Sequence, residues 1–386
     1  MKLCFVSSFP PNRANLSEYG NYLVNSFIKN KNIDGITVLA NKHENAPEIE
    51  KKGKLFIMRC WKNDSISIPF NILKAIKRLN VDLIHFNIHM MSWGRSKSTN
   101  LMGAMTPFLV KKLLRKKVVV TLHNIHDMVD LNEIKLIKPN KFVLFGLWLI
   151  TRFIFDVDVV TITLNRYVKI LKKRYYKNNI HYVPHGTLPL KVKKPILGKK
   201  TILGFGYWGP GKNLSVLVES FKDLFKEDNE IKLLIAGNSH PAFPNFIEWY
   251  ERKYKNIPVK FIGYVPENKL KKVFNQSTVI VLPYYTTTGT SGVLNLACGF
   301  GKPIISSNLR DIRDIVKDLN MDVAFVRPDN KEQLKRTISK IIYDKRLQKK
   351  MARKNLEAAK KLTFDHVSYM FTDIFTNIIE TKNKRI

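Results

Sequence analysis

Cysteine is scarce in this sequence. Cys4, Cys60 and Cys298 are the only three in 386 residues, and no two of them form a CxxC pair. This spacing argues against a disulfide-stapled scaffold and against a zinc site built on paired cysteines. It is compatible with a protein of the reducing cytosol.

Long apolar segments are also missing. The most apolar stretch, FVLFGLWLITRFIFDVDVV at 142–160, is interrupted by Arg152, Asp156 and Asp158. Its longest uncharged part is shorter than the ~18–20 residues needed to span a bilayer. The start, MKLCFVSSFPP, turns polar too soon for a secretory signal. We therefore expect a cytoplasmic protein without a membrane-spanning helix.

Acidic residues are few compared with basic ones. The chain has 31 Asp and Glu against 66 Lys and Arg, a formal net charge of +35. Such a charge predicts attraction to nucleic acid, an anionic membrane surface or phosphorylated substrates, although a lysine-rich chain with solvated faces would look the same. Two basic clusters, 111–117 and 171–177, mix cations with Leu or Tyr as membrane-surface helices do. Aromatics do not recur between the cations, so an anionic membrane is favoured over nucleic acid.

Short aliphatic runs alternate with segments of helical period along the chain, which is typical of an α/β protein with parallel sheets. A chain of 386 residues is too long for one ordinary core. We predict two Rossmann-like, doubly wound domains that face each other across a cleft, with ligands beyond the carboxyl ends of the strands. The predicted domains are 1–187 and 201–365. They are joined by a linker at 188–200, and a helix at 366–386 packs back on the first domain.

Strands are predicted from the aliphatic runs in both domains. In the first domain they are expected at 2–8, 35–41, 54–60, 81–87, 117–123, 157–163 and 180–186. In the second they are expected at 201–207, 231–237, 259–265, 278–284, 302–308 and 322–327.

The segment YYTTTGTSG, 284–292, contains hydroxyls and glycines but no charge. It follows a predicted strand and leads into a helix that starts near Ser291. Backbone N–H groups at such a helix start can hold a phosphate, and Gly289 and Gly292 allow close approach. The alternative is that Ser291 or a threonine only caps an ordinary helix.

A second glycine-rich loop, GFGYWGPGKN at 204–213, follows the first strand of the second domain. Its spacing fits neither a P-loop nor GxGxxG. It presents one ammonium group, Lys212, at the strand ends. Taken alone, Lys212 could equally be a surface lysine; together with the hydroxyl-rich loop it predicts a clamp for a diphosphate.

The order of these motifs resembles glycosyltransferase family 4, retaining enzymes of the GT-B fold that use nucleotide-sugar donors. The resemblance runs from VSSFPPNRANLSEYGNYLVNSF through VVTLHN, HYVPHG and FGYWGPGKN to SGVLNLACGFGKPIISSN, and covers nearly the whole chain. It implies that 1–187 is the acceptor-side domain and that 201–365 binds the nucleotide sugar. It also implies catalytic roles for His123, Lys212 and Thr288. It also implies donor contacts from Gly20, Gly206, Tyr207, Lys212, Gly237, Thr290, Ser291, Gly292, Val293 and Asn295.

The sequence departs from the family pattern at three charged positions. Thr288 and Leu296 stand about where many members have two glutamates, and Tyr207 stands at the position of an arginine. Asn295 is the nearby polar substitute for the ribose contact. The sequence therefore does not identify the donor sugar.

The leading hypothesis is a retaining hexosyltransferase at the inner membrane face. It would move a sugar from a nucleotide sugar to a glycan or lipid-linked acceptor. No Asp-x-Asp stands at a strand end, so we expect neither a metal nor another cofactor. The alternatives are an inactive sugar-nucleotide-binding or scaffolding protein of the same fold and, more remotely, a nucleic-acid-binding protein.

Two features of the first predicted domain each allow two interpretations. The apolar segment 142–155 is either a membrane contact or a buried crossover helix. A lone histidine such as His123 is more often structural than catalytic, and His185 is expected to pack beside the linker.

Overall fold

A computed structural model describes residues 1–386 except 13–15, 90, 126–139, 189–198, 288 and 384–386. Among the described residues the contacts divide the chain into two units. The first runs to Gly186 and resumes at Phe364, and the second is Thr187–Thr363. Most of the predicted linker lies outside the described residues.

The first unit is built on a sheet with the strand order β3-β4-β2-β1-β5-β6-β7-β8. Its strands are β1 (Lys2–Val6), β2 (Gly35–Asn41), β3 (Ile49–Lys52), β4 (Leu55–Trp61), β5 (Leu83–Ile88), β6 (Lys117–Leu122), β7 (Val159–Ile162) and β8 (Ile180–Tyr182). All pairings are parallel except the β3–β4 hairpin, which turns at Gly53 with φ +57°. β3 was not predicted, because its sequence IEKK is polar and largely exposed.

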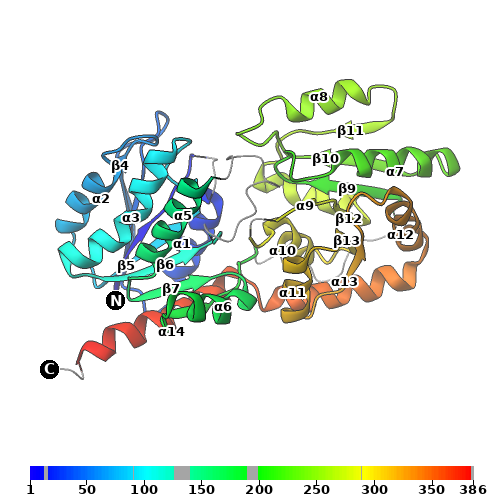
Figure 1. Ribbon diagram of the computed structural model, residues 1–386. Helices are drawn as coiled ribbons and strands as arrows, with labels where there is room; N and C mark the ends of the chain where they lie inside the picture. The colour runs from blue at the N-terminus through cyan, green and yellow to red at the C-terminus, as the bar shows by residue number, and fades with distance from the viewer. Residues whose placement is uncertain (13–15, 90, 126–139, 189–198, 288, 384–386) are drawn as a thin grey trace. The chain divides into compact units, whose positions relative to one another are not determined.

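The last helix of the chain completes the core of the first unit. The helices of this unit are α1 (Ser17–Lys29), α2 (Ile68–Lys77), α3 (Lys97–Leu114), α5 (Lys141–Ile154), α6 (Asn165–Tyr175) and α14 (Phe364–Asn383). Helix α14, red in Figure 1, packs beside α1 and places Phe364, Val367, Phe371 and Phe375 in the buried cluster. The rings of Phe27 and Phe375 lie 5.8 Å apart. This helix begins at Phe364, two residues before the predicted boundary.

The second unit has a six-stranded parallel sheet in the order β11-β10-β9-β12-β13-β14. Its strands are β9 (Thr201–Phe205), β10 (Lys232–Ala236), β11 (Val259–Phe261), β12 (Val279–Leu282), β13 (Ile304–Ser307) and β14 (Val323–Val326). In chain order this is the 3-2-1-4-5-6 arrangement of Rossmann folds, with a switch point between β9 and β12. Ligands bind such sheets beyond the carboxyl ends of these two strands, so the switch point is where the site is expected.

Helices connect the strands of the second unit. They are α7 (Leu214–Glu227), α8 (Phe246–Lys253), α9 (Glu267–Gln276), α10 (Gly292–Gly299), α11 (Arg310–Asp318), α12 (Lys331–Tyr343) and α13 (Lys345–Lys360). Each predicted strand in both units overlaps an observed one, because strands such as VIVL of β12 are buried on both faces and therefore read as continuous apolar runs. The predicted α/β class with two Rossmann-like domains is confirmed.

Candidate functional site

The two predicted phosphate loops lie side by side at the switch point of the second unit. The Asn213 N–H donates to the Pro283 carbonyl at 2.6 Å, and the Tyr285 N–H donates to the Gly211 carbonyl at 3.0 Å. Lys212 is therefore fixed against the end of β12, where the hydroxyl-rich loop begins. The strand order, rather than any local signal, creates this pairing.

The Lys212 ammonium sits between two aromatic rings. Its Nζ lies 5.5 Å from the Trp208 ring centroid and 5.4 Å from that of Tyr284. The Tyr284 hydroxyl in turn lies 3.0 Å from Ser291 Oγ, at the start of α10. Within the described part of the chain no carboxylate pairs with Lys212. Desolvation lowers the pKa of Lys212 to about 8.

Gly206 links Lys212 to the start of α10. A Cβ atom added at Gly206 would lie 2.7 Å from Lys212 Nζ and 3.1 Å from Val293 Cγ2. The residue has φ +122°, a conformation that favours glycine. Three residues predicted to bind the donor are thus neighbours.

Three glycines follow the strands at the carboxyl edge beside them. Gly206, Gly237 and Gly263 follow the neighbouring strands β9, β10 and β11, and all three have positive φ. The Gly237 N–H donates to the Gly263 carbonyl at 2.7 Å. A Cβ at Gly237 would come within 2.0 Å of the Gly206 oxygen. We call Gly206, Gly237 and Gly263 the glycine floor, because these three residues add no Cβ atom to this edge of the sheet.

The start of α10 is capped by Ser291. Its Oγ accepts from the Leu294 N–H at 3.3 Å, so the ordinary capping role that the sequence left open is present. Capping does not remove the positive end of the helix, since the first N–H groups of any helix have no intrahelical partner. Gly292 is exposed, and Thr290 is half-buried. Thr288, predicted to be catalytic, lies outside the described residues.

Two further residues predicted to contact the donor, Asn295 and Tyr207, differ in how far they are exposed. Asn295 is only 1% exposed, and its backbone carbonyl accepts from Thr187 Oγ1 at 3.2 Å. Its side chain is therefore interior in this structure, and the predicted ribose contact would require it to become accessible. Tyr207 is 41% exposed beside Gly206.

In the first unit, His123 belongs to a polar chain across three strands. Its Nε2 lies 2.7 Å from Asn87 Oδ1, and Asn87 Nδ2 donates to Ser7 Oγ at 3.0 Å. A Cβ at Gly20 would lie 3.1 Å from the same Ser7 Oγ. The structure thus brings Gly20 and His123 together. Ser7 and Asn87 were not identified from the sequence, because they come from separate strands and form no motif.

Aromatic rings enclose His123 on its other side. Its ring lies 4.6 Å from Tyr19 and 5.6 Å from His185. Desolvation, with a smaller contribution from His185, lowers the pKa of His123 well below its usual value. Burial also lowers the pKa of His185 to about 4. Both imidazoles are neutral at pH 7, and His185 packs against Tyr19 and His123 rather than simply beside a linker.

Four of the nine cations in the two basic clusters of the first unit form ion pairs. Two carboxylates, Asp156 and Asp158, lie among them. Although burial opposes the effect, Lys177 and Lys112 lower the pKa of Asp156. The ion pairs are Lys112–Asp156 at 3.3 Å, Lys177–Asp156 at 2.8 Å, and Lys111–Asp158 and Lys117–Asp158 at 3.8 Å. The clusters are therefore weaker anion attractors than their sequence suggests.

The buried face of helix α5 agrees with the crossover-helix alternative, and its other face is apolar and exposed. One face buries Leu147, Ile150, Thr151 and Ile154 in the unit. The other exposes Phe142, Leu144, Phe145 and Trp148, and the Phe145 and Trp148 rings stack at 5.8 Å. None of the helices among the described residues combines the length and apolar character that crossing a bilayer requires.

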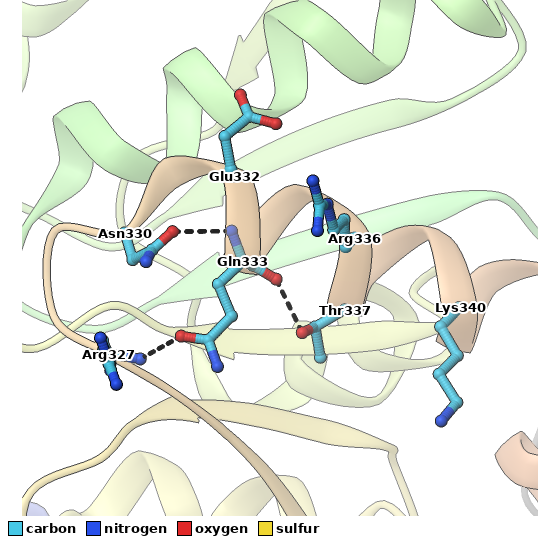
Figure 2. A pocket seen from close by; sticks show the side chains of 7 residues that line it. All are labelled: Arg327, Asn330, Glu332, Gln333, Arg336, Thr337 and Lys340. Carbon is cyan, nitrogen blue, oxygen red and sulfur yellow. Dashed lines mark hydrogen bonds between the residues drawn. The ribbon is translucent and has the colours of Figure 1, made fainter.

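A separate pocket of the second unit lies along α12 (Figure 2). Asn330 Oδ1 accepts from the Gln333 N–H, and Gln333 Oε1 accepts from the Arg327 N–H, both at 2.8 Å. These bonds fix the start of α12 and join it to the end of β14. The polar groups are thus used by the fold, and we assign no ligand to this pocket.

Two Rossmann-like domains, the second with a glycine-lined switch point, define the GT-B class of glycosyltransferase folds. Residues 190–358 match the family "Glycosyl transferases group 1". The chain therefore has a GT-B fold, and its second unit is similar to the glycosyl transferases of group 1.

Solved structures and a curated relative agree with this class. Sucrose-phosphate synthase from Thermosynechococcus elongatus superposes with a TM-score of 0.77 at 15% identity, covering 98% of this chain and 99% of that one. HepE from Anabaena, solved in complex with UDP-glucose, has a TM-score of 0.71 at 12% identity, covering 98% and 100%. The Bacillus subtilis (strain 168) protein YtcC, provisionally named a glycosyltransferase, is 23% identical over 50% of this chain and 49% of its own length. The match thus spans about half of that curated relative.

Proposed function

We propose that the protein is a retaining member of glycosyltransferase family 4. It transfers a sugar from a nucleotide-diphosphate sugar to a glycan or lipid-linked acceptor at the cytoplasmic membrane face. The observation that carries the proposal is the meeting of Lys212 and the α10 start at Gly206, on the switch point of the second unit. The UDP-glucose bound in HepE supports a nucleotide sugar as the donor.

The mechanism follows from where charge develops. Breaking the glycosyl–phosphate bond leaves a negative diphosphate and an oxocarbenium-like sugar, so donors and cations aimed at the diphosphate accelerate the reaction. Lys212 supplies the cation, and the start of α10 supplies N–H groups. The glycine floor lets the donor lie against the backbone. We propose that no metal or other cofactor is needed, and chelation with EDTA should leave transfer unchanged.

The donor site is tested by a thermal-shift screen of nucleoside diphosphates and nucleotide sugars. We expect one base family to raise the melting temperature. Lys212→Ala should weaken that binding by roughly 10- to 100-fold, the effect of losing one charge-assisted hydrogen bond. Lys226→Ala, which removes an exposed cation from α7, is the matched control and should bind normally. Equal binding by both variants would reject the assigned site.

His123 is proposed to position the transferred sugar or the acceptor hydroxyl as a neutral imidazole. His123→Ala should lower kcat at least tenfold while the dissociation constant for the nucleoside diphosphate stays within twofold. Asn87→Ala, which removes the partner of Nε2, should reduce kcat less. If His123→Ala retained full kcat, the histidine would be structural only.

A binding protein without transferase activity is the second candidate. Residues 285–299 contain no carboxylate, whereas many family members place two glutamates there. Incubation with a radiolabelled donor and a membrane or glycan extract separates the candidates. Transfer or slow hydrolysis indicates an enzyme; tight binding with neither indicates a scaffolding role.

A further inference from the structure

Positive charge is concentrated at the end of the second unit. Thirteen of the 35 residues from Arg327 to Lys361 are Lys or Arg, and four are Asp or Glu. The segment thus holds a net charge of +9, about a quarter of the +35 of the chain, in under a tenth of its length. Most of these cations lie on α13.

One face of α13, with the residue after its end, carries six cations and one acid. A shallow hollow there is lined by Arg346, Lys349, Lys350, Arg353, Lys354 and Lys361. The spacing of three, four and seven residues places them on one side of a helix about 24 Å long. No ion pair joins any of the six to a described carboxylate. Glu357, the only acid in the lining, pairs with Lys360 at 2.7 Å.

The opposite face of α13 holds the helix firmly in the unit. Met351, Ala352 and Ala359 are buried, and Asn355 Nδ2 donates to the Lys302 carbonyl at 2.9 Å. Helix α13 packs on α10, beside it in Figure 1. The cations are therefore displayed on a fixed helix and not on a loose tail.

The cationic face is distinct from the donor site. Its hollow also includes Leu319 and Asn320, in the turn from α11 into β14. That turn lies at the amino ends of the parallel strands, whereas Gly206 and Lys212 lie at the carboxyl ends. Occupancy of one site does not require the other.

We propose that this face of α13 docks the protein on an anionic membrane surface. Helical clusters of four to eight Lys and Arg are attracted to anionic lipids. In the clusters at 111–117 and 171–177, four of the nine cations pair with Asp156 or Asp158, whereas none of the six cations on the α13 face pairs with a described carboxylate. The lining has no aromatic side chain on which a single-stranded nucleic acid could stack. The electrostatic membrane contact is thus on the second unit.

The test is sedimentation with phosphatidylcholine vesicles that contain 0 or about 30% phosphatidylglycerol, at low and at physiological salt. The unmodified protein should bind the anionic vesicles more tightly, and salt should weaken the binding. A variant that combines Lys349→Gln, Lys350→Gln and Arg353→Gln should bind the anionic vesicles about tenfold more weakly, or weaker still. Glu357→Gln, which removes the one acid of the lining, should strengthen the binding.

The matched control carries the same charge change elsewhere in the second unit: Lys260→Gln, Lys271→Gln and Lys272→Gln, all at exposed positions. It should stay within twofold of the unmodified protein. Three outcomes would overturn the proposal. They are equal losses of binding in both variants, no preference for anionic vesicles, and displacement of the vesicles by single-stranded RNA. The inference deepens the proposed function, but vesicle binding needs no donor. The α13 variant should keep its nucleotide thermal shift, so either proposal can fail alone.

Discussion

We expect the ammonium group of Lys212 to set the pH range of donor binding. Desolvation lowers the pKa of Lys212 to about 8, so the group is mostly charged at pH 7 and loses its proton as the pH rises through 8. A bound diphosphate raises this pKa again, so binding takes up a proton at high pH. We expect affinity to fall by up to about tenfold per pH unit above the pKa of the free protein. Calorimetric titration with the best nucleoside diphosphate between pH 7 and 9.5 measures this, and Lys212→Ala supplies the pH dependence of the ligand itself. A parallel pH profile for both proteins would contradict the role.

The two glycines Gly237 and Gly263 should differ in how well they tolerate an added Cβ atom. Gly237→Ala combines a positive φ of +104° with a contact of 2.0 Å to the Gly206 oxygen. Gly263→Ala has a positive φ of +61° but meets nothing within 4 Å. We expect Gly263→Ala to cost about 1 kcal/mol of unfolding free energy and Gly237→Ala about 3 kcal/mol or more, with loss of nucleotide binding. Urea unfolding and the thermal-shift assay measure the two effects. Equal costs would mean that the contact relaxes without strain.

Helix α5 gives a prediction of its own, because it exposes aromatic rings that a bilayer interface favours. Trp148 is 39% exposed on this face, and Trp249 is 50% exposed on α8 of the other unit. Vesicles should shift the tryptophan emission to shorter wavelength. Trp148→Phe should remove most of that shift, and Trp249→Phe should preserve it. The reverse pattern would exclude α5 as a membrane contact.

Most strands were predictable because buried parallel strands are continuous apolar runs, as in VIVL of β12. The pairing of the Lys212 loop with the 284–292 loop was also predictable, since it follows from the Rossmann strand order. The polar strand β3 was not, because nothing in IEKK distinguishes an edge strand from a loop. The interior position of Asn295 depends on the rotation of a short helix against the sheet. The neutralised lysines around Asp156 depend on contacts between residues far apart in the chain.

At the scale of the whole molecule, we expect low pH to lower the stability of the first unit more than that of the second. In the first unit, desolvation lowers the pKa of His85 to about 3 and that of His185 to about 4, and it also lowers the pKa of His123. The second unit, Thr187–Thr363, contains one histidine, His240. Each buried histidine is neutral in the folded unit but takes up a proton near pH 6.5 when unfolded. The stability that depends on the neutral form is therefore complete above pH 6.5 and falls as the pH drops toward 4, by up to about 1.4 kcal/mol per pH unit for each group.

Hydrogen exchange at pH 7.5 and 5.0, corrected for intrinsic rates, should show β1 and β5 losing protection while β9 and β12 lose less. His85→Gln should reduce the pH dependence of the first unit, since the amide does not titrate and can still bond Thr121, now 2.7 Å from the imidazole. His43→Gln, in the turn before β3, is the matched control and should retain the full dependence. A uniform loss of protection across both sheets would mean that the units unfold together, and that the buried imidazoles do not confine acid sensitivity to the first of them.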